Sequence, residues 1–418
     1  MAHFILLVLF ITIFASPAIA NTYNVVSLGA KPDGQTDSSK AFLSTWASAC
    51  DSSGPSSIYV PSGRFFLNRV KFQGPCKSSA ITFRIDGTLV APGYGVMGSS
   101  ESWVSFNRVV GLSVLGGTLD GQGTALWACK LAGRGCPMGA ASIMFTGSKG
   151  LLISGLTSVN SELGHINING CDGVKIQGVK ISAASNSPNT DGIHVQMSND
   201  VTIIGTRIST GDDCVSIGPG MQNLWIENIS CGPGHGISIG SLGKSSQEPG
   251  VQNVTVKTAV FTDTQNGLRI KTWGRPSDGY VKGVVFEHAV MQNVQNPIII
   301  TQNYCPGNKN CPDQYSGVKI SEVTYNDVRG SSATPVAVNF DCSPTRPCSG
   351  IGLQDIKLTY NNGPARAFCK HAGGSSAGDV CRRVACDFES GNRTEKQCGG
   401  KTENTEDPKE SIQDIYNL

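Results

Sequence analysis

The stretch from Asn189 to Lys271 decides the fold of this chain. It contains four short polar clusters, each beside an alternating apolar run: Asn189-Thr190-Asp191, Gly211-Asp212-Asp213-Cys214, Gly234-His235-Gly236 and Arg269-Ile270-Lys271. The period of two within each apolar run predicts a short β-strand, and the strands begin at Ile193, Val215, Ile237 and Leu268. These starts lie 22, 22 and 31 residues apart, so the stretch predicts a repeating structural unit.

A repeat of this length is typical of a solenoid, in which neighbouring coils stack on one another. If the coils stack in register, adjacent strands lie about 4.8 Å apart, and residues distant in the sequence become neighbours. Asp191, Asp213 and His235 each stand two residues before an apolar start, so they are predicted to form one column. Arg269 and Lys271 alternate with apolar residues and are predicted to point outward beside that column.

The same pattern continues beyond this stretch and predicts an all-β chain of about 8 to 10 coils. Eight runs belong to the series, from Ile143–Phe145 to Val336–Val338, whereas residues 58–141 look strand-like but irregular. A second apolar run follows several of the strands, which indicates two or three strands per coil. Near the start, Ala41, Phe42, Thr45 and Trp46 lie at helical spacing and predict a short amphipathic helix that caps the open end.

The two ends of the chain differ from the repeat. Residues 1–20 combine an apolar run with Ala18-Ile19-Ala20, as in a secretory signal peptide, and no segment is long enough to span a membrane. Residues 389–418 are poor in apolar residues and predict a flexible tail, which leaves 21–388 as a single solenoid domain. A net charge of +2 argues against nonspecific nucleic-acid binding. We therefore expect a secreted, extracellular protein.

Fifteen cysteines in a secreted chain indicate disulfides. The predicted pairs are Cys50/Cys76, Cys129/Cys136, Cys214/Cys231, Cys305/Cys311 and Cys342/Cys348. Because the total is odd, at least one thiol lacks an intramolecular partner, and Cys171 is the candidate. A structural zinc site is the competing interpretation, but it is disfavoured because the chain has no Cys-x-x-Cys pair. Three sequons could carry glycans, at Asn228, Asn253 and Asn392.

The four polar clusters, in this order, resemble the four signatures of the polygalacturonases, pectin-hydrolysing glycosidases with a right-handed parallel β-helix. The resemblance runs from Tyr23 to about Asn362 and includes the end-capping segment. It implies hydrolysis of polygalacturonate, the acidic backbone of pectin, in the plant cell wall. The residues of the four clusters are most similar to those of the plant enzymes, and residues 216–220 resemble the pollen type that cuts from chain ends. A monomer without metal or other cofactor is expected.

The resemblance also assigns roles to matching residues. It implies that Asp212 is the general acid, that Asp191 and Asp213 hold and activate water in an inverting reaction, and that His235 tunes the acid. The implied substrate contacts are Asn189, Arg269, Lys271 and Tyr304. A bidentate Arg beside a Lys suits a substrate with a carboxylate on every sugar. A coil spacing of about 4.8 Å, however, is nearer the carboxylate separation of retaining enzymes than that of inverting ones.

Other interpretations of the same residues stay open. Each Asp alone could be a turn residue that bonds its own backbone, and each cation alone could be a solvated side chain. A pectate lyase on a similar solenoid would use calcium and an arginine base for elimination, which the Asp-Asp, His and Arg-x-Lys set does not favour. A rhamnogalacturonan hydrolase and an inactive wall-binding protein are further alternatives. The sequence leaves the choice between end-cutting and mid-chain cutting open.

Overall fold

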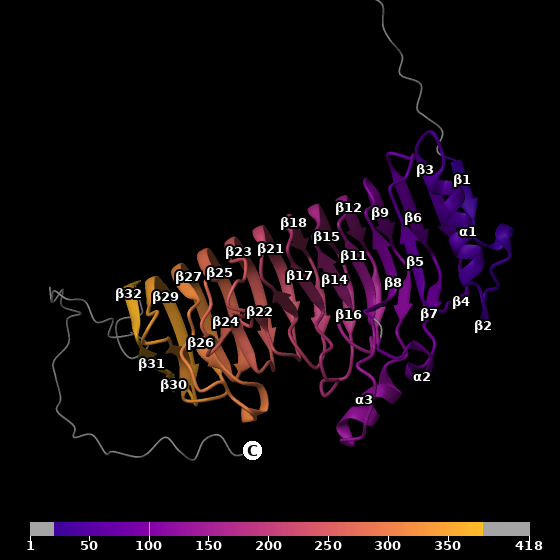
Figure 1. Ribbon diagram of the computed structural model, residues 1–418. Helices are drawn as coiled ribbons and strands as arrows, with labels where there is room; N and C mark the ends of the chain where they lie inside the picture. Colours follow the sequence, from indigo (N-terminus) through magenta and orange to yellow (C-terminus); the bar gives the residue numbers. More distant parts are fainter. Residues whose placement is uncertain (1–20, 100, 379–418) are drawn as a thin grey trace, which may run out of the picture.

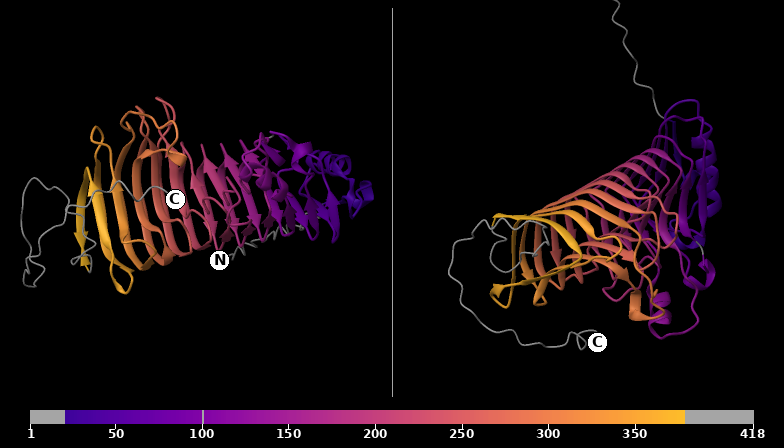
Figure 2. Two further views of the ribbon diagram at one scale, coloured as in Figure 1. Left: turned by 90° about the horizontal axis from the view of Figure 1, so that it is seen from below. Right: turned by 60° about the vertical axis from the view of Figure 1, so that its left-hand side comes forward.

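The protein is described from a computed structural model that covers residues 21–99 and 101–378 (Figure 1). The expected signal peptide at 1–20, the expected tail at 389–418 and the sequon at Asn392 lie outside the described residues. The predicted boundary at residue 388 lies outside them too. Within the described residues the chain forms one elongated rod of stacked coils, which Figure 2 shows from two further directions.

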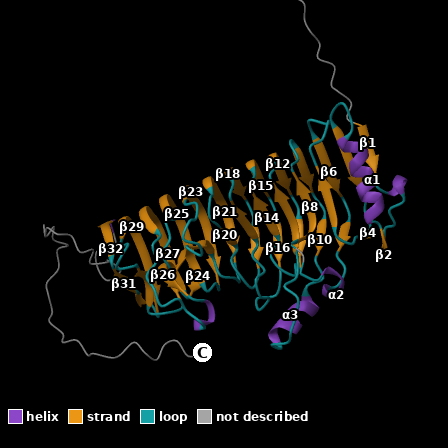
Figure 3. Ribbon diagram, viewed as in Figure 1, coloured by secondary structure: helices purple, strands orange, loops and turns teal. Residues whose placement is uncertain are grey.

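Two parallel sheets wind along the rod, as the predominance of strand in Figure 3 illustrates. The first sheet has one strand per coil and carries the predicted series: β5 (Val70–Gln73), β8 (Ser102–Asn107), β11 (Ala141–Thr146), β14 (Ile166–Asn169), β17 (Ile193–Gln196), β20 (Val215–Ile217), β22 (Ile237–Leu242), β24 (Asn266–Trp273), β26 (Asn296–Tyr304), β28 (Val336–Asp341) and β31 (Arg366–Lys370). Eleven strands in this sheet exceed the predicted 8 to 10 coils. The difference arises because residues 58–141, interpreted as irregular, also form coils.

The second sheet supplies one or two strands to each coil, as predicted. Its strands are β1 (Asn21–Asn24), β2 (Asp33–Asp37), β3 (Ser56–Val60), β4 (Arg64–Phe66), β6 (Ile81–Ile85), β7 (Thr88–Val90), β9 (Leu112–Leu115), β10 (Thr118–Asp120), β12 (Lys149–Ser154), β13 (Thr157–Val159), β15 (Asp172–Gln177), β16 (Lys180–Ser182), β18 (Asn199–Ile204), β19 (Arg207–Ser209), β21 (Gln222–Cys231), β23 (Val251–Thr262), β25 (Tyr280–Val294), β27 (Lys319–Ser332), β29 (Cys348–Tyr360), β30 (Gly363–Pro364) and β32 (Ala372–Ala377). Only the short β30 pairs antiparallel, with β29, among the strands of the described residues.

The register of the first sheet confirms the predicted stacking with one correction. Ile193, Val215, Ile237 and Leu268 are successive partners, so the four runs lie directly above one another. At the far end, Ile298 pairs with Val338 rather than with the predicted Val336. A shift of two residues keeps the same side chains on the inner face, so the apolar alternation alone does not distinguish the two registers.

The inward side chains stack into ladders that form the core. Ile193, Val215, Ile237 and Leu268 are each 0% exposed. Nearer the N-terminal end the ladder is aromatic. The ring centroid of Phe106 lies 4.8 Å from that of Phe72 and 5.3 Å from that of Phe145. Because each coil buries its apolar face only against its neighbours, the ladders hold the coils in register.

Helices close one end of the rod and project from one side. The predicted capping helix is α1 (Ser39–Cys50), which packs against β1, β3 and β5 and buries Ala41, Phe42, Thr45 and Trp46. The others are α2 (Tyr94–Met97), α3 (Thr124–Leu131), η1 (Val26–Leu28) and η2 (Pro306–Asn308). In Figure 1, α2, α3 and the loop after β26 project on the same side of the rod. No helix among the described residues is both long and apolar enough to cross a membrane.

The predicted disulfides are present. All five predicted pairs form, with sequence separations from 6 residues in Cys305–Cys311 to 26 in Cys50–Cys76. Cys171 is unpaired and buried, as expected. Cys214–Cys231 ties the start of β20 to the end of β21, next to one of the polar clusters.

Candidate active site

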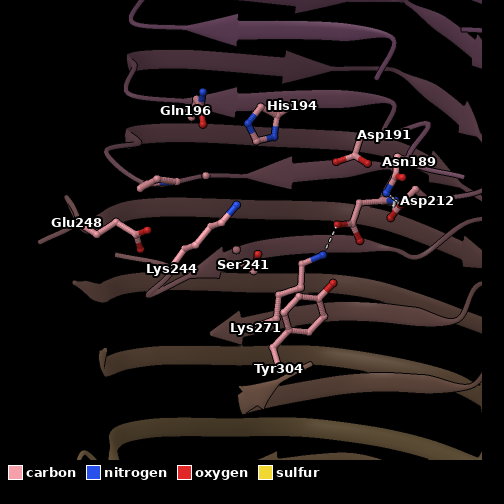
Figure 4. A pocket seen from close by; sticks show the side chains of 14 residues that line it. Asn189, Asp191, His194, Gln196, Asp212, Ser241, Lys244, Glu248, Lys271 and Tyr304 are labelled. Carbon is pink, nitrogen blue, oxygen red and sulfur yellow. Dashed lines mark hydrogen bonds and ion pairs between the residues drawn. The ribbon is translucent and has the colours of Figure 1, made fainter. Parts of the chain in front are cut away.

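The structure brings the predicted residues together on the outer side of the first sheet. Asn189 and Asp191 lie in the loop before β17, Asp212 and Asp213 precede β20, and His235 precedes β22. Arg269 and Lys271 are outward residues of β24, and Tyr304 ends β26. Since these segments belong to adjacent coils, residues up to 115 positions apart in the sequence meet in one place (Figure 4).

Asp213 is a buried carboxylate with two strong partners. It is 1% exposed and accepts a hydrogen bond of 2.7 Å from Ser238 Oγ. Its other oxygen, Oδ2, lies 2.6 Å from the ammonium of Lys271. Lys271 is itself only 7% exposed, so it lies beside the carboxylates as predicted and is not the solvated side chain that the alternative interpretation describes. Burial disfavours the charged form of Lys271, yet Asp213 outweighs it and holds the pKa of Lys271 above its ordinary value.

Asp212 lies beside Asp213 but faces a different set of groups. His235 Nδ1 lies 3.0 Å from its Oδ1, and the amide of Asn189 donates to its Oδ2 at 3.4 Å. Asn189 adopts a left-handed backbone with φ of 59°, which suits an asparagine at a tight turn. Burial raises the pKa of Asp212, but the hydrogen bond and charge of His235 together outweigh burial, so the net pKa is lowered.

Asp191 forms the third corner of the site, and no cation of the described residues forms an ion pair with it. Its Oδ2 accepts a hydrogen bond of 2.5 Å from Ser216 Oγ, and Ser216 lies 2.8 Å from His194 Nδ1. Burial, and then the negative charges of Asp212 and Asp213, raise the pKa of Asp191 to about 7. Asp191 therefore binds a proton more tightly than Asp212, whose pKa is lowered.

The cations on β24 are arranged around one aromatic ring. The guanidinium carbon of Arg269 and the ammonium nitrogen of Lys271 each lie 5.3 Å from the centre of the Tyr304 ring. Trp273 packs edge-on against the same ring, with centroids 5.3 Å apart. Arg269 Nε is buried without a hydrogen-bond partner in the structure. A buried, unpaired guanidinium nitrogen is well suited to receive an anionic ligand.

A cavity of about 370 Å³ opens over these residues. Figure 4 shows the carboxylates on one side of it, Lys271 and Tyr304 below them, and a further polar wall opposite. The lining side chains and backbone come from Asn189, Asp191, His194, Gln196, Asp212, Asp213, Gly218, Pro219, Gly240, Ser241, Lys244, Glu248, Lys271 and Tyr304. The cavity therefore combines acids, a hydroxyl and cations, which suits a polar ligand with negative charge.

The residues fit a divalent cation poorly. Asp212, Asp213 and His235 offer ligand atoms within 4.8 Å of one another, which is close enough for a metal ion. Yet the Lys271 ammonium already occupies one oxygen of Asp213, and His235 occupies one oxygen of Asp212. A divalent cation would have to displace or oppose these groups, so the site favours proton chemistry over metal binding.

Sequence reasoning missed several polar residues of the site, although a signal for them was present. His194, Ser216 and Ser238 each stand one residue after an apolar start, and they pair in register with Arg269. They form a second column beside the predicted one. Equivalent positions of successive coils stack on one another. This reasoning identifies the residues two positions before each strand start, and it identifies His194, Ser216 and Ser238 equally well when it is applied to outward positions within the strands.

A parallel β-helix with clustered carboxylates beside outward cations defines a class of polysaccharide-cleaving enzyme, and the comparisons with known proteins agree. Residues 50–380 match the glycosyl hydrolases family 28, so the chain belongs to this family and is a glycoside hydrolase.

The chain is 62% identical to a polygalacturonase from Prunus persica, over 86% of this chain and 92% of that protein. It is 42% identical to an exopolygalacturonase from Platanus acerifolia, over 88% of this chain and 98% of that one. Among solved structures, the endo-xylogalacturonan hydrolase from Aspergillus tubingensis matches with a TM-score of 0.75 and 24% identity. That match covers 85% of this chain and all of the other, and it supports the fold alone.

Proposed function

We propose that this glycoside hydrolase cleaves the α-1,4 linkages between galacturonate residues of pectin. One observation carries the proposal: the Asp212 and Asp213 carboxylates line the same cavity as Lys271 and Tyr304, and the Arg269 guanidinium lies 5.3 Å from the centre of the Tyr304 ring. Acids provide the hydrolytic chemistry, and the free Arg269 Nε provides a contact for a sugar carboxylate. The names of the relatives support the same substrate.

The three aspartates have different roles in the proposed reaction. Asp212 protonates the leaving oxygen, and Asp191 with Asp213 holds a water molecule on the other face of the sugar, with inversion at the anomeric carbon. His235, 3.0 Å from Asp212, orients that carboxyl group and compensates the charge that appears on it when its proton leaves. Asn189 donates to the second oxygen of the same carboxyl.

The pKa directions of the unliganded site favour a proton on Asp191, whereas this mechanism needs the proton on Asp212. The pKa of Asp191 is raised to about 7, whereas the pKa of Asp212 is lowered. The productive form, with Asp212 protonated and Asp191 ionised, is thus the minor one of two forms that carry the same number of protons. Substrate favours it by bringing an oxygen that accepts the Asp212 proton and a water that donates to Asp191.

End-cutting is the form of attack that we favour. The support is the exopolygalacturonase from Platanus acerifolia, to which this chain is similar over 98% of that protein's length. The site coils also lie between two projections of the rod, α2 with α3 on one side along the chain and the loop carrying η2 on the other (Figure 1). Such projections can limit the length of polysaccharide on one side of a cleavage site.

Two further parts of the proposal concern where and how the chain works. Five disulfides support an oxidising, extracellular compartment such as the cell wall. Every group assigned a role comes from one chain, which supports action as a monomer. Asn228 and Asn253 are exposed on β21 and β23 and are accessible as glycan acceptors.

The experiment is a product time course on polygalacturonate with the wild type and Asp212→Asn. New reducing ends without UV-absorbing products are expected, and Asp212→Asn should lower kcat by about 10²- to 10⁴-fold. Asp200→Asn, an exposed acid on β18, is the matched control and should retain full activity. Monomer release with slow loss of viscosity supports end-cutting, and NMR of the first anomer formed tests inversion. UV-absorbing products, or full activity in Asp212→Asn, would contradict the assignment.

A further inference from the structure

We propose that Ser216 and His194 are positioning residues that hold Asp191 in one orientation both when it is ionised and when it is protonated. The inference rests on the proposed function, because it takes Asp191 to be the carboxylate that receives a proton from water. Neither residue belongs to the four polar clusters. Both are outward residues of neighbouring strands, His194 of β17 and Ser216 of β20, and they are partners in register.

The geometry is a continuous chain of hydrogen bonds. Ser216 Oγ lies 2.5 Å from Asp191 Oδ2 and 2.8 Å from His194 Nδ1, and Ser216 is 3% exposed. The ring of His194 packs close to Gly218. A Cβ added to Gly218 would lie 3.2 Å from Cε1 of the His194 ring. His194 also lines the cavity, so the chain leads from the carboxylate to the cavity wall.

A hydroxyl suits this position because it can donate or accept. When Asp191 is ionised, the Ser216 hydroxyl donates to it and accepts from His194 Nδ1–H. When Asp191 carries a proton on Oδ2, it donates to Ser216, and the hydroxyl turns to donate to His194 Nδ1, whose proton is then on Nε2. Each group keeps its partner in both states, the heavy atoms stay in place, and the three groups together gain only the one proton that Asp191 takes up, because His194 stays neutral and changes tautomer.

Asp213 shows the contrasting arrangement one coil further on. Ser238 is the register partner of Ser216 and donates to Asp213 at 2.7 Å, as Ser216 does to Asp191. However, Asp213 also contacts the Lys271 ammonium, which has donors only. The Lys271 ammonium therefore gives Asp213 a contact that can only donate, whereas the Asp191 contacts can either donate or accept. This difference assigns the proton-accepting role to Asp191 rather than to Asp213.

Several other groups face Asp191 and enter any pH dependence. The neighbouring coils contribute the acids Asp212 and Asp213 and the cation Lys271. The buried His165 lies on the preceding coil. His165 contacts Asp191 through its backbone N–H, at 2.7 Å, and burial lowers the pKa of its side chain to about 3. It stays neutral across the working range. The Ser216 hydroxyl stabilises the ionised form of Asp191 against the two acids.

Removing the hydroxyl should therefore have two separable effects. Asp191 loses its orientation, which lowers kcat more than it changes KM. Asp191 also binds its proton more tightly. The productive form, with Asp212 protonated and Asp191 ionised, therefore becomes rarer, and the last proton of the group of carboxylates is released at higher pH. The alkaline limb of the kcat/KM profile should then move to higher pH.

The test compares the full-length wild type with Ser216→Ala, Ser216→Thr, His194→Phe and Ser238→Ala, measuring kcat and KM on polygalacturonate across the acidic and neutral range. Ser216→Ala should lower kcat by about 10- to 100-fold, with KM within about two-fold, and move the alkaline limb upward. Ser216→Thr keeps a hydroxyl and should stay within about three-fold of wild type. His194→Phe should move the limb in the same direction. Ser238→Ala should lower kcat without moving it.

Thermal unfolding of each variant identifies any that has lost its fold, and Ser216→Thr and His194→Phe then carry the test. An unchanged alkaline limb in both Ser216→Ala and His194→Phe would overturn the inference. So would equal losses in Ser216→Ala and Ser216→Thr with an unchanged pH profile, because that pattern indicates a packing role. If the wild type does not hydrolyse polygalacturonate, or Asp191→Asn stays active, the proposed function itself fails.

Discussion

Lys271 is the cation that the structure places in direct contact with the acids of the site. The alternation of β24 predicts an outward cation beside the column of carboxylates, and the ammonium contacts Asp213 at 2.6 Å and is buried there. Such a pair is costly to break, because removing one partner leaves the other charge buried and uncompensated. Lys271 therefore contributes to stability as well as to the electrostatics of the cavity.

Lys271→Met should lower the free energy of unfolding by about 3 to 5 kcal/mol at neutral pH and abolish most activity. The matched control is Lys282→Met, since Lys282 pairs with Glu322 at 3.5 Å with both side chains more than half exposed. An exposed pair contributes about 0 to 1 kcal/mol, so this variant should unfold like the wild type. Urea denaturation measures both. Equal destabilisation by the two substitutions would contradict the distinction between buried and exposed pairs.

Asp191→Asn should stabilise the protein at neutral pH. The folded pKa of Asp191 is raised to about 7 from 3.8, so the folded state binds the proton more tightly than the unfolded state. The folded protein therefore loses stability as pH rises from about 4 to about 7, by up to about 4 kcal/mol from this group. Asparagine cannot ionise and should avoid that loss.

The measurement is the difference in unfolding free energy between Asp191→Asn and wild type as a function of pH. The difference should grow from acidic to neutral pH. A constant difference would mean that Asp191 titrates normally in the folded state.

At the scale of elements, the disulfide Cys214–Cys231 links the site to the solenoid. It joins the residue after Asp213 to the end of β21, with a sequence separation of 17. The double variant Cys214→Ala/Cys231→Ala should lose about 3 kcal/mol of stability through the freer unfolded chain, and kcat should fall because the Asp213 loop loosens. Cys129→Ala/Cys136→Ala removes a bridge of separation 7 near α3 and is the control.

The control should lose about 2 kcal/mol and keep its kcat. Thermal unfolding and initial rates measured below both transitions separate the two effects. If both double variants lose kcat equally, the Cys214–Cys231 bridge has no particular role in placing Asp213.

The elements themselves were largely predictable from local patterns. Helix α1 follows from the spacing of Phe42 and Trp46, and the strands of the first sheet follow from their alternation. The predicted starts of four successive strands proved to be partners in register. The exception, Ile298 with Val338, is one that alternation cannot resolve, because a shift of two residues preserves the inward face.

At the scale of the whole molecule, the charge around the cavity is local. The net charge is only +2, so the chain as a whole attracts a polyanion weakly. The cations that line or flank the cavity are Lys244, Lys271 and Arg269, and they stand next to acids. Long-range attraction should therefore be modest, and short-range contacts should dominate binding.

We expect KM on polygalacturonate to rise with ionic strength, by about two- to five-fold between low and physiological salt, with little change in kcat. Screening weakens attraction to exposed charge but leaves the buried Asp213–Lys271 pair intact. Initial rates in a salt series at fixed pH test this expectation. A kcat that falls with salt while KM stays constant would instead indicate screening within the catalytic group.

The amino-acid sequence by itself determined the solenoid, the phase of its coils and the acids and cations that meet on one face, and it indicated the five disulfide pairs. The first three follow from periods of two and from repeat spacing, which are local and survive small errors in register, and the pairs follow from the spacing of the cysteines. The tertiary structure alone decided that Lys271 is buried against Asp213, that Ser216 bridges Asp191 and His194, and that burial and two neighbouring acids raise the pKa of Asp191. These properties depend on which side chains of adjacent coils touch and how little water reaches them, and no pattern within one strand encodes that.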